Sequence, residues 1–541
     1  MELSPSAHID TFCRDRLPPS EQWPELLFDL PELAYPARLN CATVLLDDVI
    51  EEFGPDRRCL VTADETWTYA DLLRRARQVA QVLVEDLGLV PGNRVLLRGP
   101  NNPWLVACWF GVLRAGGVVV TTMPLLRAHE LETLCGISTP TLALCDHRFL
   151  AEPASGVPDL PTVPYGGDTP DDLIARCEAK SGEFAAVDTA ADDVALIAFT
   201  SGTTGRPKAT LHFHRDVLAN ADTFSRHVLK PEPGDLFTGT PPLGFTFGLG
   251  GLVVFPLRAG AATLLLEKAS PPQLAQVVRD FGVTILITAP TAYRAILGAG
   301  LAADMTSLRR CVSAGEALPA DVWHGFYDAT GIRLIDGIGA TEMLHVFISA
   351  ADDDIRPGST GRAVPGYQAD VLTAEGTSAP DGESGLLAVK GPTGCRYLDD
   401  PRQSKYVQDG WNLTGDTYIR DAEGYFWYQA RSDDMIVSSG YNIAGPEVEL
   451  ALLAHPDVME CGVAGAPDTA RGMIVKAFVV LRAGVEPGEA TAKSLQEFVK
   501  ATIAPYKYPR AVDFVDALPR TGNGKLLRAE LRSWARGDSA R

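Results

Sequence analysis

The chain contains 541 residues, too many for a single hydrophobic core, so we expect two or more domains. Hydrophobic residues make up 46% of it and charged residues 22%, as in an ordinary globular protein. With 48 Lys and Arg against 69 Asp and Glu, the formal net charge is −21. That charge argues against a nucleic-acid partner and against an anionic membrane surface.

The N-terminal segment, the apolar stretches and the cysteines together indicate where the protein works. The first twenty residues, MELSPSAHIDTFCRDRLPPS, contain no basic region followed by an apolar one, so we expect no signal peptide. The two most apolar stretches are interrupted by Arg114 and by Pro256 and Arg258, so neither is predicted to span a membrane. Ten cysteines without a CxxC pair indicate reduced, buried thiols. We therefore predict a cytoplasmic protein.

From about residue 60 to 350, short apolar runs alternate with helical stretches. The runs are NRVLLRG, GGVVVTTM, VALIAFT, AATLLLE, VTILITA, LRRCVSAG and IRLIDGIG. This alternation predicts parallel sheets with helices on their faces. From about 358 to 430, shorter alternating runs are separated by turn pairs such as DG, which predicts antiparallel strands that form a small barrel.

After the sequence RSDDMI, the pattern predicts a compact α+β unit. Its helices are expected at GPEVELALLAH, at AKSLQEFVKATI and at the C-terminus, and its strands at MECGVAGA, IVKAFVVL and AVDFVDA. We place the domain boundary at Asp433, which gives an N-terminal domain of residues 1–432 and a C-terminal domain of residues 433–541.

A loop rich in hydroxyl groups and glycine, TSGTTGRPKA, occupies residues 200–209. It follows the apolar run VALIAF and precedes the segment TLHFH and an amphipathic helix, and a loop in this position commonly holds phosphate. It is not a Walker loop, because Arg206 and Pro207 separate Gly205 from Lys208. The alternative is an ordinary surface loop. His212 and His214 alternate on the following strand, without a third metal ligand nearby.

Three further segments carry polar residues at the ends of predicted strands and turns. They are DGIGATE at 336–342, NLTGDTYIRDAEGYFWYQARSDDMI at 412–436, and PRTGNGKLLR at 519–528. Each alone has an ordinary alternative: a solvated strand end, a hairpin turn or a basic surface helix. With all four segments present in this order, the chain resembles the adenylate-forming superfamily of acyl-CoA synthetases, peptide-synthetase adenylation domains and luciferases.

The resemblance implies an α/β fold class: a large N-terminal domain of two doubly wound αβ subdomains plus a small β-barrel, with a small mobile α+β C-terminal domain. It implies that Thr341 contacts the α-phosphate, that Glu342 binds Mg²⁺, and that Lys525 bridges the substrate carboxylate and the α-phosphate. The residues implied to bind ATP or AMP are Thr200, Ser201, Gly202, Thr203, Thr204, Lys208, Glu316, Asp336, Gly337, Ile338, Asp416 and Arg431.

The match departs from the family at two positions and suggests a moving domain. Ile338 stands where many members have an aromatic residue, and Ala430 replaces the glycine usual before Arg431. Asp416 is expected on the ribose hydroxyls. Asp433 matches the family's hinge, and the coenzyme A residues implied by the segment SSGYNI are Ser439, Gly440 and Tyr441.

The stretch PPLGFTFGLGG, at 241–251, is similar to the segment that lines the acyl site in this family. Together with DGIGATEMLHVFIS it looks most like the benzoate–CoA ligase and 2-aminobenzoate–CoA ligase branch. The residues expected to line the aryl pocket are Phe245, Thr246, Phe247, Ala314, Gly315, Gly339 and His345. Of these, Thr246 and His345 are placed near a ring substituent. Core packing is the alternative for the two phenylalanines.

These observations predict an AMP-forming acid–thiol ligase that uses ATP, Mg²⁺ and coenzyme A. The acid is expected to be a benzoate, with a 2-amino or 2-hydroxy group, and the protein a monomer or homodimer. One alternative is an adenylating ligase that passes the acyl group to a carrier protein or another acceptor. The other is a noncatalytic nucleotide-binding relative, against which the joint presence of Lys208, Glu342, Asp416 and Lys525 argues.

Overall fold

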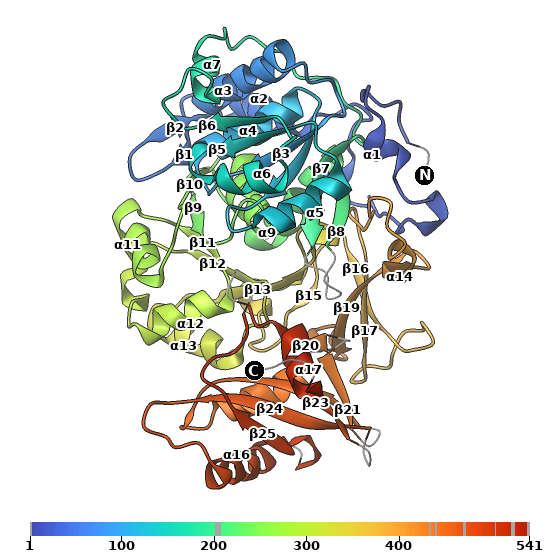
Figure 1. The fold of residues 1–541 in the computed structure, drawn as a ribbon, viewed down its shortest axis with the longest axis vertical. Helices are drawn as coiled ribbons and strands as arrows, with labels where there is room; N and C mark the ends of the chain where they lie inside the picture. Colours follow the sequence, from blue (N-terminus) through green and yellow to red (C-terminus); the bar gives the residue numbers. More distant parts are fainter. Residues whose placement is uncertain are drawn as a thin grey trace. The chain divides into compact units, whose positions relative to one another are not determined.

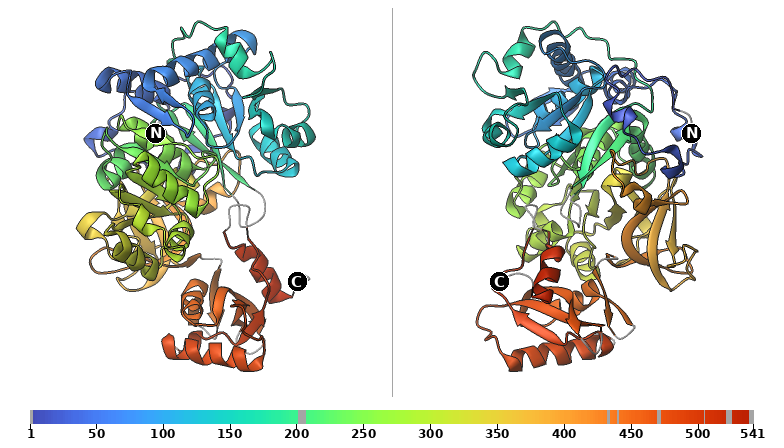
Figure 2. Two further views of the ribbon diagram at one scale, coloured as in Figure 1. Left: turned by 90° about the vertical axis from the view of Figure 1, so that its left-hand side faces the viewer. Right: turned by 45° about the vertical axis from the view of Figure 1, so that its right-hand side comes forward.

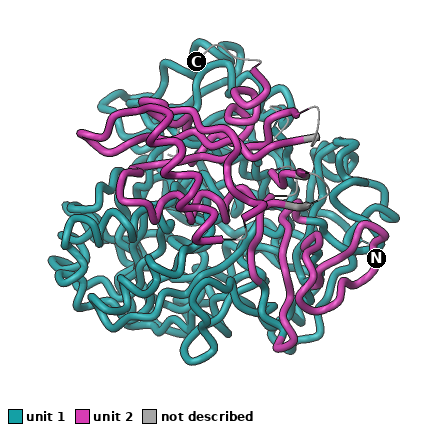
Figure 3. Tube along the Cα trace, turned by 90° about the horizontal axis from the view of Figure 1, so that it is seen from below, with its two compact units in different colours: residues 1–369, 388–413, 424–426 teal, residues 370–387, 414–423, 427–541 magenta. Residues whose placement is uncertain are grey.

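The computed structural model describes residues 3–200, 207–431, 434–438, 441–468, 472–503, 505–520 and 525–537. The chain divides into two units (Figure 3). Unit 1 contains residues 1–369, 388–413 and 424–426, and unit 2 contains residues 370–387, 414–423 and 427–541. The predicted boundary at Asp433 lies outside the described residues and stays a prediction.

Unit 1 contains a six-stranded sheet with the order β6-β5-β3-β4-β7-β8. Its strands are β3 (Arg94–Arg98), β4 (Val118–Thr122), β5 (Leu142–Asp146), β6 (Thr162–Tyr165), β7 (Val194–Thr200) and β8 (Lys208–Phe213). Neighbouring strands are parallel except for β7 and β8, which form an antiparallel pair. The predicted buried strand VALIAF is confirmed as part of β7, in which five consecutive residues are buried.

Helices cover both faces of this sheet. They are α2 (Cys41–Phe53), α3 (Tyr69–Gln81), α4 (Pro103–Arg114), α5 (Ala128–Ser138), α6 (Ala151–Gly156) and α7 (Leu173–Glu178). Figure 1 shows α2 and α3 on one side of strands β3 and β5, and α5 and α6 on the other. Helix α3 begins with a capping box in which Thr68 and Asp71 satisfy each other's backbone N–H groups. This part of unit 1 is doubly wound.

The second sheet of unit 1 has nine strands, in the order β15-β14-β13-β12-β11-β9-β10-β1-β2. Its strands are β1 (Arg58–Val61), β2 (Thr66–Thr68), β9 (Leu236–Gly239), β10 (Ala262–Leu264), β11 (Ile285–Thr288), β12 (Arg310–Ala314), β13 (Leu334–Gly339), β14 (Val346–Ser349) and β15 (Arg362–Ala363). The six central strands are parallel and the end strands antiparallel. The predicted apolar runs are therefore confirmed as parallel strands.

Helices α11 (Pro271–Phe281), α12 (Pro290–Gly298) and α13 (Ala320–Thr330) group together along this sheet (Figures 1 and 2). The helix predicted after TLHFH is also present. It begins as α8 (His214–Asn220) and continues as one π-helical stretch, η5 (Ala221–Leu229). Its apolar residues Val217, Leu218, Ala221, Phe224 and Val228 are all buried. Within TLHFH, the strand ends at Phe213 and His214 opens the helix.

The predicted antiparallel segment forms a five-stranded sheet whose residues belong to both units. Its order is β16-β17-β19-β18, and β20 also pairs with β19. The strands are β16 (Gln368–Leu372), β17 (Ser384–Lys390), β18 (Val407–Gln408), β19 (Trp411–Arg420) and β20 (Phe426–Arg431).

The C-terminal part of unit 2 has the predicted α+β pattern. A sheet with the order β22-β21-β24-β23, and with β25 beside β24, is built from β21 (Met435–Ser438), β22 (Tyr441–Ala444), β23 (Val458–Asp468), β24 (Gly472–Leu481) and β25 (Ala511–Phe514). Its helices are α15 (Gly445–Leu453), α16 (Glu489–Thr502) and α17 (Arg528–Arg536). A separate core that includes Ile443, Val448, Val475 and Leu495 holds this part together.

All ten cysteines lie among the described residues, and every one is a buried free thiol. Burial raises the pKa of each thiol, and for Cys135, one of the two most exposed, to about 11. The expectation of buried reduced cysteines is therefore confirmed. Across the described ranges, no helix combines the length and the hydropathy needed to cross a bilayer.

Candidate active site

The donor-rich loop lies between two paired strands of unit 1. Thr200 ends β7 and Lys208 begins β8, and the two residues are register partners across the antiparallel pair. Ser201, Gly202, Thr203 and Thr204 lie outside the described residues. The hydroxyl oxygen of Thr200 is buried and has no hydrogen-bond partner among the residues described. A hydroxyl in this state is suited to a ligand that brings its own polar group.

Lys208 and Glu342 meet in unit 1 although 134 positions separate them in the sequence. The Nζ of Lys208 lies 3.1 Å from Oε1 of Glu342, and both side chains are largely buried. A third residue, Tyr397, joins them: Lys208 donates to its hydroxyl oxygen at 2.6 Å, and that hydroxyl donates to Oε1 of Glu342 at 2.5 Å. Tyr397 was missed in the sequence, because no spacing or composition singles it out.

The turn that carries Thr341 and Glu342 is a 3-10 helix, η8 (Thr341–Met343). His212 holds this turn against β8, since its Nε2 lies 2.8 Å from the Thr341 carbonyl oxygen and must donate to it. Burial lowers the pKa of His212 to about 4, so the ring is neutral. Leu344 follows with φ of 69°, an uncommon conformation for a branched residue. The role of the HFH segment is therefore to anchor neighbouring elements.

The residues predicted around the nucleotide base lie on adjacent strands. Strand β12 pairs with β13 so that Ser313 is opposite Asp336 and Ala314 is opposite Gly337. Gly315, with φ of 90°, turns the chain away directly after β12. Glu316 and Ile338 are half-buried and Gly339 is exposed. The structure therefore brings together Ala314 to Glu316 and Asp336 to Gly339, as the sequence predicts from two separate segments.

Asp336 is unusual because its Oδ1 is buried and has no hydrogen-bond partner within the described ranges. Burial raises the pKa of its carboxyl to about 8, and a backbone hydrogen bond at Gly337 offsets only part of this. At neutral pH the group is therefore mostly protonated, and a protonated carboxyl can both donate and accept. A pocket beside it is also lined by Trp323, Arg356 and Ser359.

His345, one of the predicted aryl-pocket residues, is buried in an aromatic cluster that includes a second predicted residue, Phe247. His345 is 3% exposed, and its ring packs against three phenylalanine rings, with centroids 5.6 Å from Phe224, 5.5 Å from Phe247 and 4.5 Å from Phe255. Both ring nitrogens are without a hydrogen-bond partner in the part of the chain that is described. Burial lowers the pKa of His345 to about 3, and the nearby Phe247 backbone counters this only in part. The imidazole is neutral.

Two glycines pack so closely against His345 that a side chain at either position would collide with it. A Cβ on Gly250 would lie 2.4 Å from Cδ2 of His345, and one on Gly339 would lie 2.6 Å from the His345 carbonyl oxygen. The other predicted members of the pocket, Phe245 and Thr246, are half-buried at the start of α9 (Thr246–Leu249). Within FTFGLGG, Gly250 therefore makes room for His345 in the aromatic cluster, a consequence the sequence alone did not predict.

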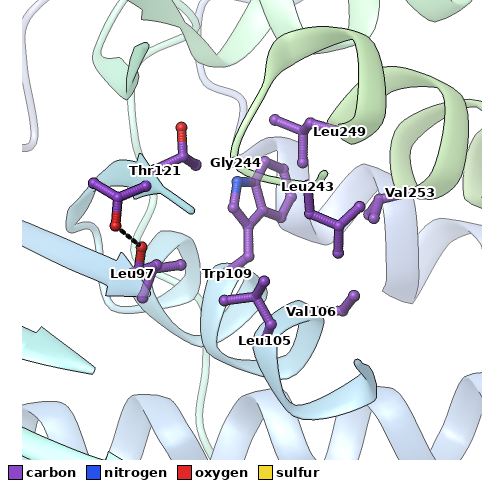
Figure 4. Close-up of a pocket in the computed structure, with 10 residues that line it drawn as sticks. Leu97, Leu105, Val106, Trp109, Thr121, Leu243, Gly244, Leu249 and Val253 are labelled. Carbon is purple, nitrogen blue, oxygen red and sulfur yellow. Dashed lines mark hydrogen bonds between the residues drawn. The ribbon is translucent and has the colours of Figure 1, made fainter. Parts of the chain in front are cut away.

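A narrow apolar pocket lies beside the same segment (Figure 4). Leu243, Gly244 and Leu249 line one side, and Leu97 and Trp109 lie among the residues opposite. The indole N–H of Trp109 is buried and has no hydrogen-bond partner within the described part of the chain. No motif singles out Trp109, since it lies in one of several buried helices.

The remaining predicted residues belong to unit 2. Arg431 donates from Nη1 to Oδ1 of Asp416 and to the Thr414 carbonyl oxygen, each at 3.1 Å. Asp416 and Arg431 therefore lie side by side. Lys525 is exposed, three residues before α17. Tyr441 begins β22. Asp433, Ser439 and Gly440 lie outside the described residues.

The described residues thus combine two mainly parallel sheets and a buried Lys208–Glu342 pair in unit 1 with a separate α+β sheet in unit 2. The family model for the AMP-binding enzyme matches residues 46–396, and that for the AMP-binding enzyme C-terminal domain matches residues 447–525. The chain belongs to the AMP-binding enzyme family. The predicted family and fold class are confirmed.

Relatives with known activities agree with this assignment. The chain is 34% identical to benzoate–CoA ligase of Thauera aromatica over 513 residues, which covers 93% of this chain and 97% of the relative. The crystal structure of the anthranilate CoA ligase AuaEII with anthranoyl-AMP superposes with a TM-score of 0.87 at 33% identity, covering 94% and 99% of the two chains.

A benzoate CoA ligase from Burkholderia xenovorans LB400 superposes with a TM-score of 0.82 at 30% identity, covering 91% of this chain and 100% of that one. The predicted enzyme class, an acid–thiol ligase, is confirmed.

Proposed function

We propose that the enzyme activates a benzoate-type acid, with a 2-amino or 2-hydroxy substituent, and transfers it from the acyl-adenylate to coenzyme A. The observation that carries this proposal is the aromatic cluster of Phe224, Phe247 and Phe255 around His345. Flat rings favour a flat substrate, and a neutral imidazole without partners offers one donor and one acceptor. The similarity to benzoate and anthranilate CoA ligases supports the same acid class.

In the first half-reaction, a carboxylate oxygen of the acid attacks the α-phosphorus of ATP, and the bond to pyrophosphate breaks. The work of the protein is to position the reactants and to neutralise charge. We assign phosphate contacts to Lys208, Thr341 and the loop at 200–204, and the bridge between carboxylate and α-phosphate to Lys525. Asp336 is assigned to the base, where a protonated carboxyl can pair with a purine edge.

Mg²⁺ fits this site as part of a metal–nucleotide complex. No cluster of three or more His, Cys, Asp or Glu occurs among the described residues, so a cage made of protein ligands alone is not found there. Mg²⁺ in nucleotide enzymes is typically held by one or two carboxylates together with substrate phosphates. Glu342 supplies the carboxylate. When bound, the ion neutralises charge on the phosphates as pyrophosphate leaves.

In the second half-reaction, the thiol of coenzyme A attacks the acyl carbon and AMP leaves. We propose that rotation at Asp433 withdraws Lys525 and presents Ser439, Gly440 and Tyr441 to the thiol substrate. Inside unit 2, Asp434 forms ion pairs with Arg528, at 3.7 Å, and with Arg532. The C-terminal helix is therefore bound to the residue that follows the proposed hinge. The cytoplasmic location of the protein and its state as a monomer or homodimer stay predictions.

A panel of acids tests the substrate class. With ATP, Mg²⁺ and coenzyme A, we expect kcat/KM to be highest for 2-aminobenzoate or 2-hydroxybenzoate, lower for benzoate, and lowest for acetate and octanoate. The physical reason is that a ring group paired with His345 is not left buried without a partner, a difference of about 1–3 kcal/mol. A higher value for octanoate or acetate than for any benzoate would refute the aryl assignment, and a clear preference for plain benzoate would refute only the ortho group.

His345→Phe tests the role of the imidazole separately. The variant keeps an aromatic ring in the cluster but removes both nitrogens, so we expect the preference for the ortho-substituted acid over benzoate to fall about tenfold. Thr246→Val is the matched variant for the other polar candidate. If selectivity survives His345→Phe and is lost in Thr246→Val, the hydroxyl and not the imidazole recognises the substituent. If it survives both, neither residue does.

The alternative acceptor is a carrier protein. The same assay, run by pyrophosphate release with and without coenzyme A, distinguishes the two. Sustained turnover that requires coenzyme A supports the proposal. If pyrophosphate release stops after a single turnover and coenzyme A does not restart it, a different acceptor is supported.

A further inference from the structure

Tyr397 lies at the candidate active site because the backbone around it is fixed against β8. The Leu211 N–H donates to the Arg396 carbonyl oxygen at 2.8 Å, and the Leu398 N–H donates to the Ala209 carbonyl oxygen at 2.9 Å. The Tyr397 N–H donates to the side-chain oxygen of Gln403 at 2.9 Å. Three hydrogen bonds on consecutive residues therefore fix the chain beside the strand that begins with Lys208.

The phenol ring is buried, and its hydroxyl is shared by two charged groups. It donates to Oε1 of Glu342 and accepts from Nζ of Lys208, while the ammonium also lies 4.8 Å from the centre of the Tyr397 ring. A tyrosine hydroxyl has one O–H to donate and lone pairs that accept, so it can serve the carboxylate and the ammonium at the same time. A packing role alone would need the ring and not this oxygen.

The hydrogen bonds to Glu342 use one of its two carboxylate oxygens. Within the described part of the chain, both of those that reach its carboxylate end on Oε1. Oε2 is left for another partner. The Lys208 ammonium is likewise divided between a carboxylate and a neutral phenol, so it is not committed to Glu342 alone. An ammonium bound only to the carboxylate would have to be displaced before a cation could approach.

We propose that Tyr397 is a positioning residue for the metal–nucleotide complex: its hydroxyl engages Oε1 of Glu342 and shares Lys208, which leaves Oε2 for Mg²⁺ and the ammonium for phosphate. This inference rests on the proposed role of Glu342 in holding Mg²⁺ with ATP. Without the hydroxyl, Lys208 and Glu342 pair with each other more tightly, and the metal has to compete with the ammonium for the carboxylate. Phosphate loses less, because the ammonium has three N–H donors and the carboxylate does not occupy all of them.

The test is the binding of ATP to the full chain by titration calorimetry, with excess Mg²⁺ and with a chelator, in wild type and Tyr397→Phe. We expect the variant to raise the Kd of Mg·ATP about tenfold and to change the Kd of metal-free ATP much less. Bound Mn²⁺, measured by electron paramagnetic resonance in the presence of ATP, should fall in parallel. The KM of the acid should be unchanged.

Tyr293→Phe is the matched control, because this tyrosine is also buried in unit 1 and its hydroxyl donates to the Val312 carbonyl oxygen at 2.9 Å. It reports the effect of losing any buried phenol oxygen. The proposal is overturned if Tyr397→Phe leaves the ratio of the two Kd values at its wild-type level, whether or not the melting temperature falls. A wild type that binds Mg·ATP but prefers a nonaromatic acid leaves this inference standing and removes only the substrate assignment.

Discussion

Lys525→Ala is expected to lower the rate of acid-dependent adenylation by about 10²–10³-fold, and to leave thioester formation from supplied acyl-adenylate largely intact. Only the first transition state has a carboxylate and an α-phosphate that approach each other, and an ammonium between them stabilises the charge they share. Lys525 is exposed on unit 2, as expected for a side chain that is delivered to one step and withdrawn for another. Pyrophosphate release and thioester formation, measured separately, check this.

Asp433→Pro is the reciprocal control. Proline fixes φ at the proposed hinge, so this variant should lose the thioester step much more than adenylation. Equal loss of both half-reactions in Lys525→Ala would mean that the lysine acts in both steps or only supports the fold. Comparable activity of Asp433→Pro in both steps, with an unchanged melting curve, would remove Asp433 from the hinge role.

Asp216→Ala is expected to destabilise unit 1 by about 3–5 kcal/mol. Asp216, on α8, and Arg396 form an ion pair at 2.7 Å in which both side chains are 0% exposed. The guanidinium also lies 4.1 Å from the centre of the Phe213 ring, and its Nε and Nη2 find no hydrogen-bond partner among the described residues. Removing the carboxylate leaves a buried cation with little to compensate its desolvation.

A double-mutant cycle checks this expectation. Asp216→Leu with Arg396→Met replaces both charges by apolar groups, and it should recover most of the loss in the free energy of unfolding, measured with urea. If the free energy of unfolding of Asp216→Ala were within about 1 kcal/mol of the wild-type value, water would have to reach the ion pair. Since Arg396 directly precedes Tyr397, the single variant should also weaken Mg·ATP binding, whereas the double variant should restore it.

The alternation of apolar runs was sufficient to predict the two sheet systems and the α+β C-terminal part. Runs such as VALIAFT and IRLIDGIG are short, contain β-branched residues and are bounded by glycine or polar residues, so their length and composition indicate strands. The strand after the loop was harder, because TLHFH contains both its end and the start of a helix. His214 is the first residue of α8, which no local signal marks.

The candidate site was predicted only where residues lie within a motif. Lys208 and Glu342 were found because each lies in a short segment that resembles a motif of a known family. Tyr397 reaches them through its backbone pairing with β8, 189 positions from Lys208, and no local pattern encodes such a pairing. His345 was predicted as a site residue, but its phenylalanine neighbours at 224 and 255 were not, because apolar residues of a helix appear as ordinary core.

The buried cysteines affect what happens to an activated acyl group. An acyl-adenylate reacts with any accessible thiolate, yet all ten thiols of this chain are buried and their pKa values are raised. The enzyme therefore presents no accessible thiol of its own that competes with the thiol acceptor, and self-acylation at sulfur is suppressed. In a colorimetric thiol assay with an aromatic disulfide, we expect the folded protein to contribute no signal. The loss of coenzyme A thiol then equals the amount of thioester formed.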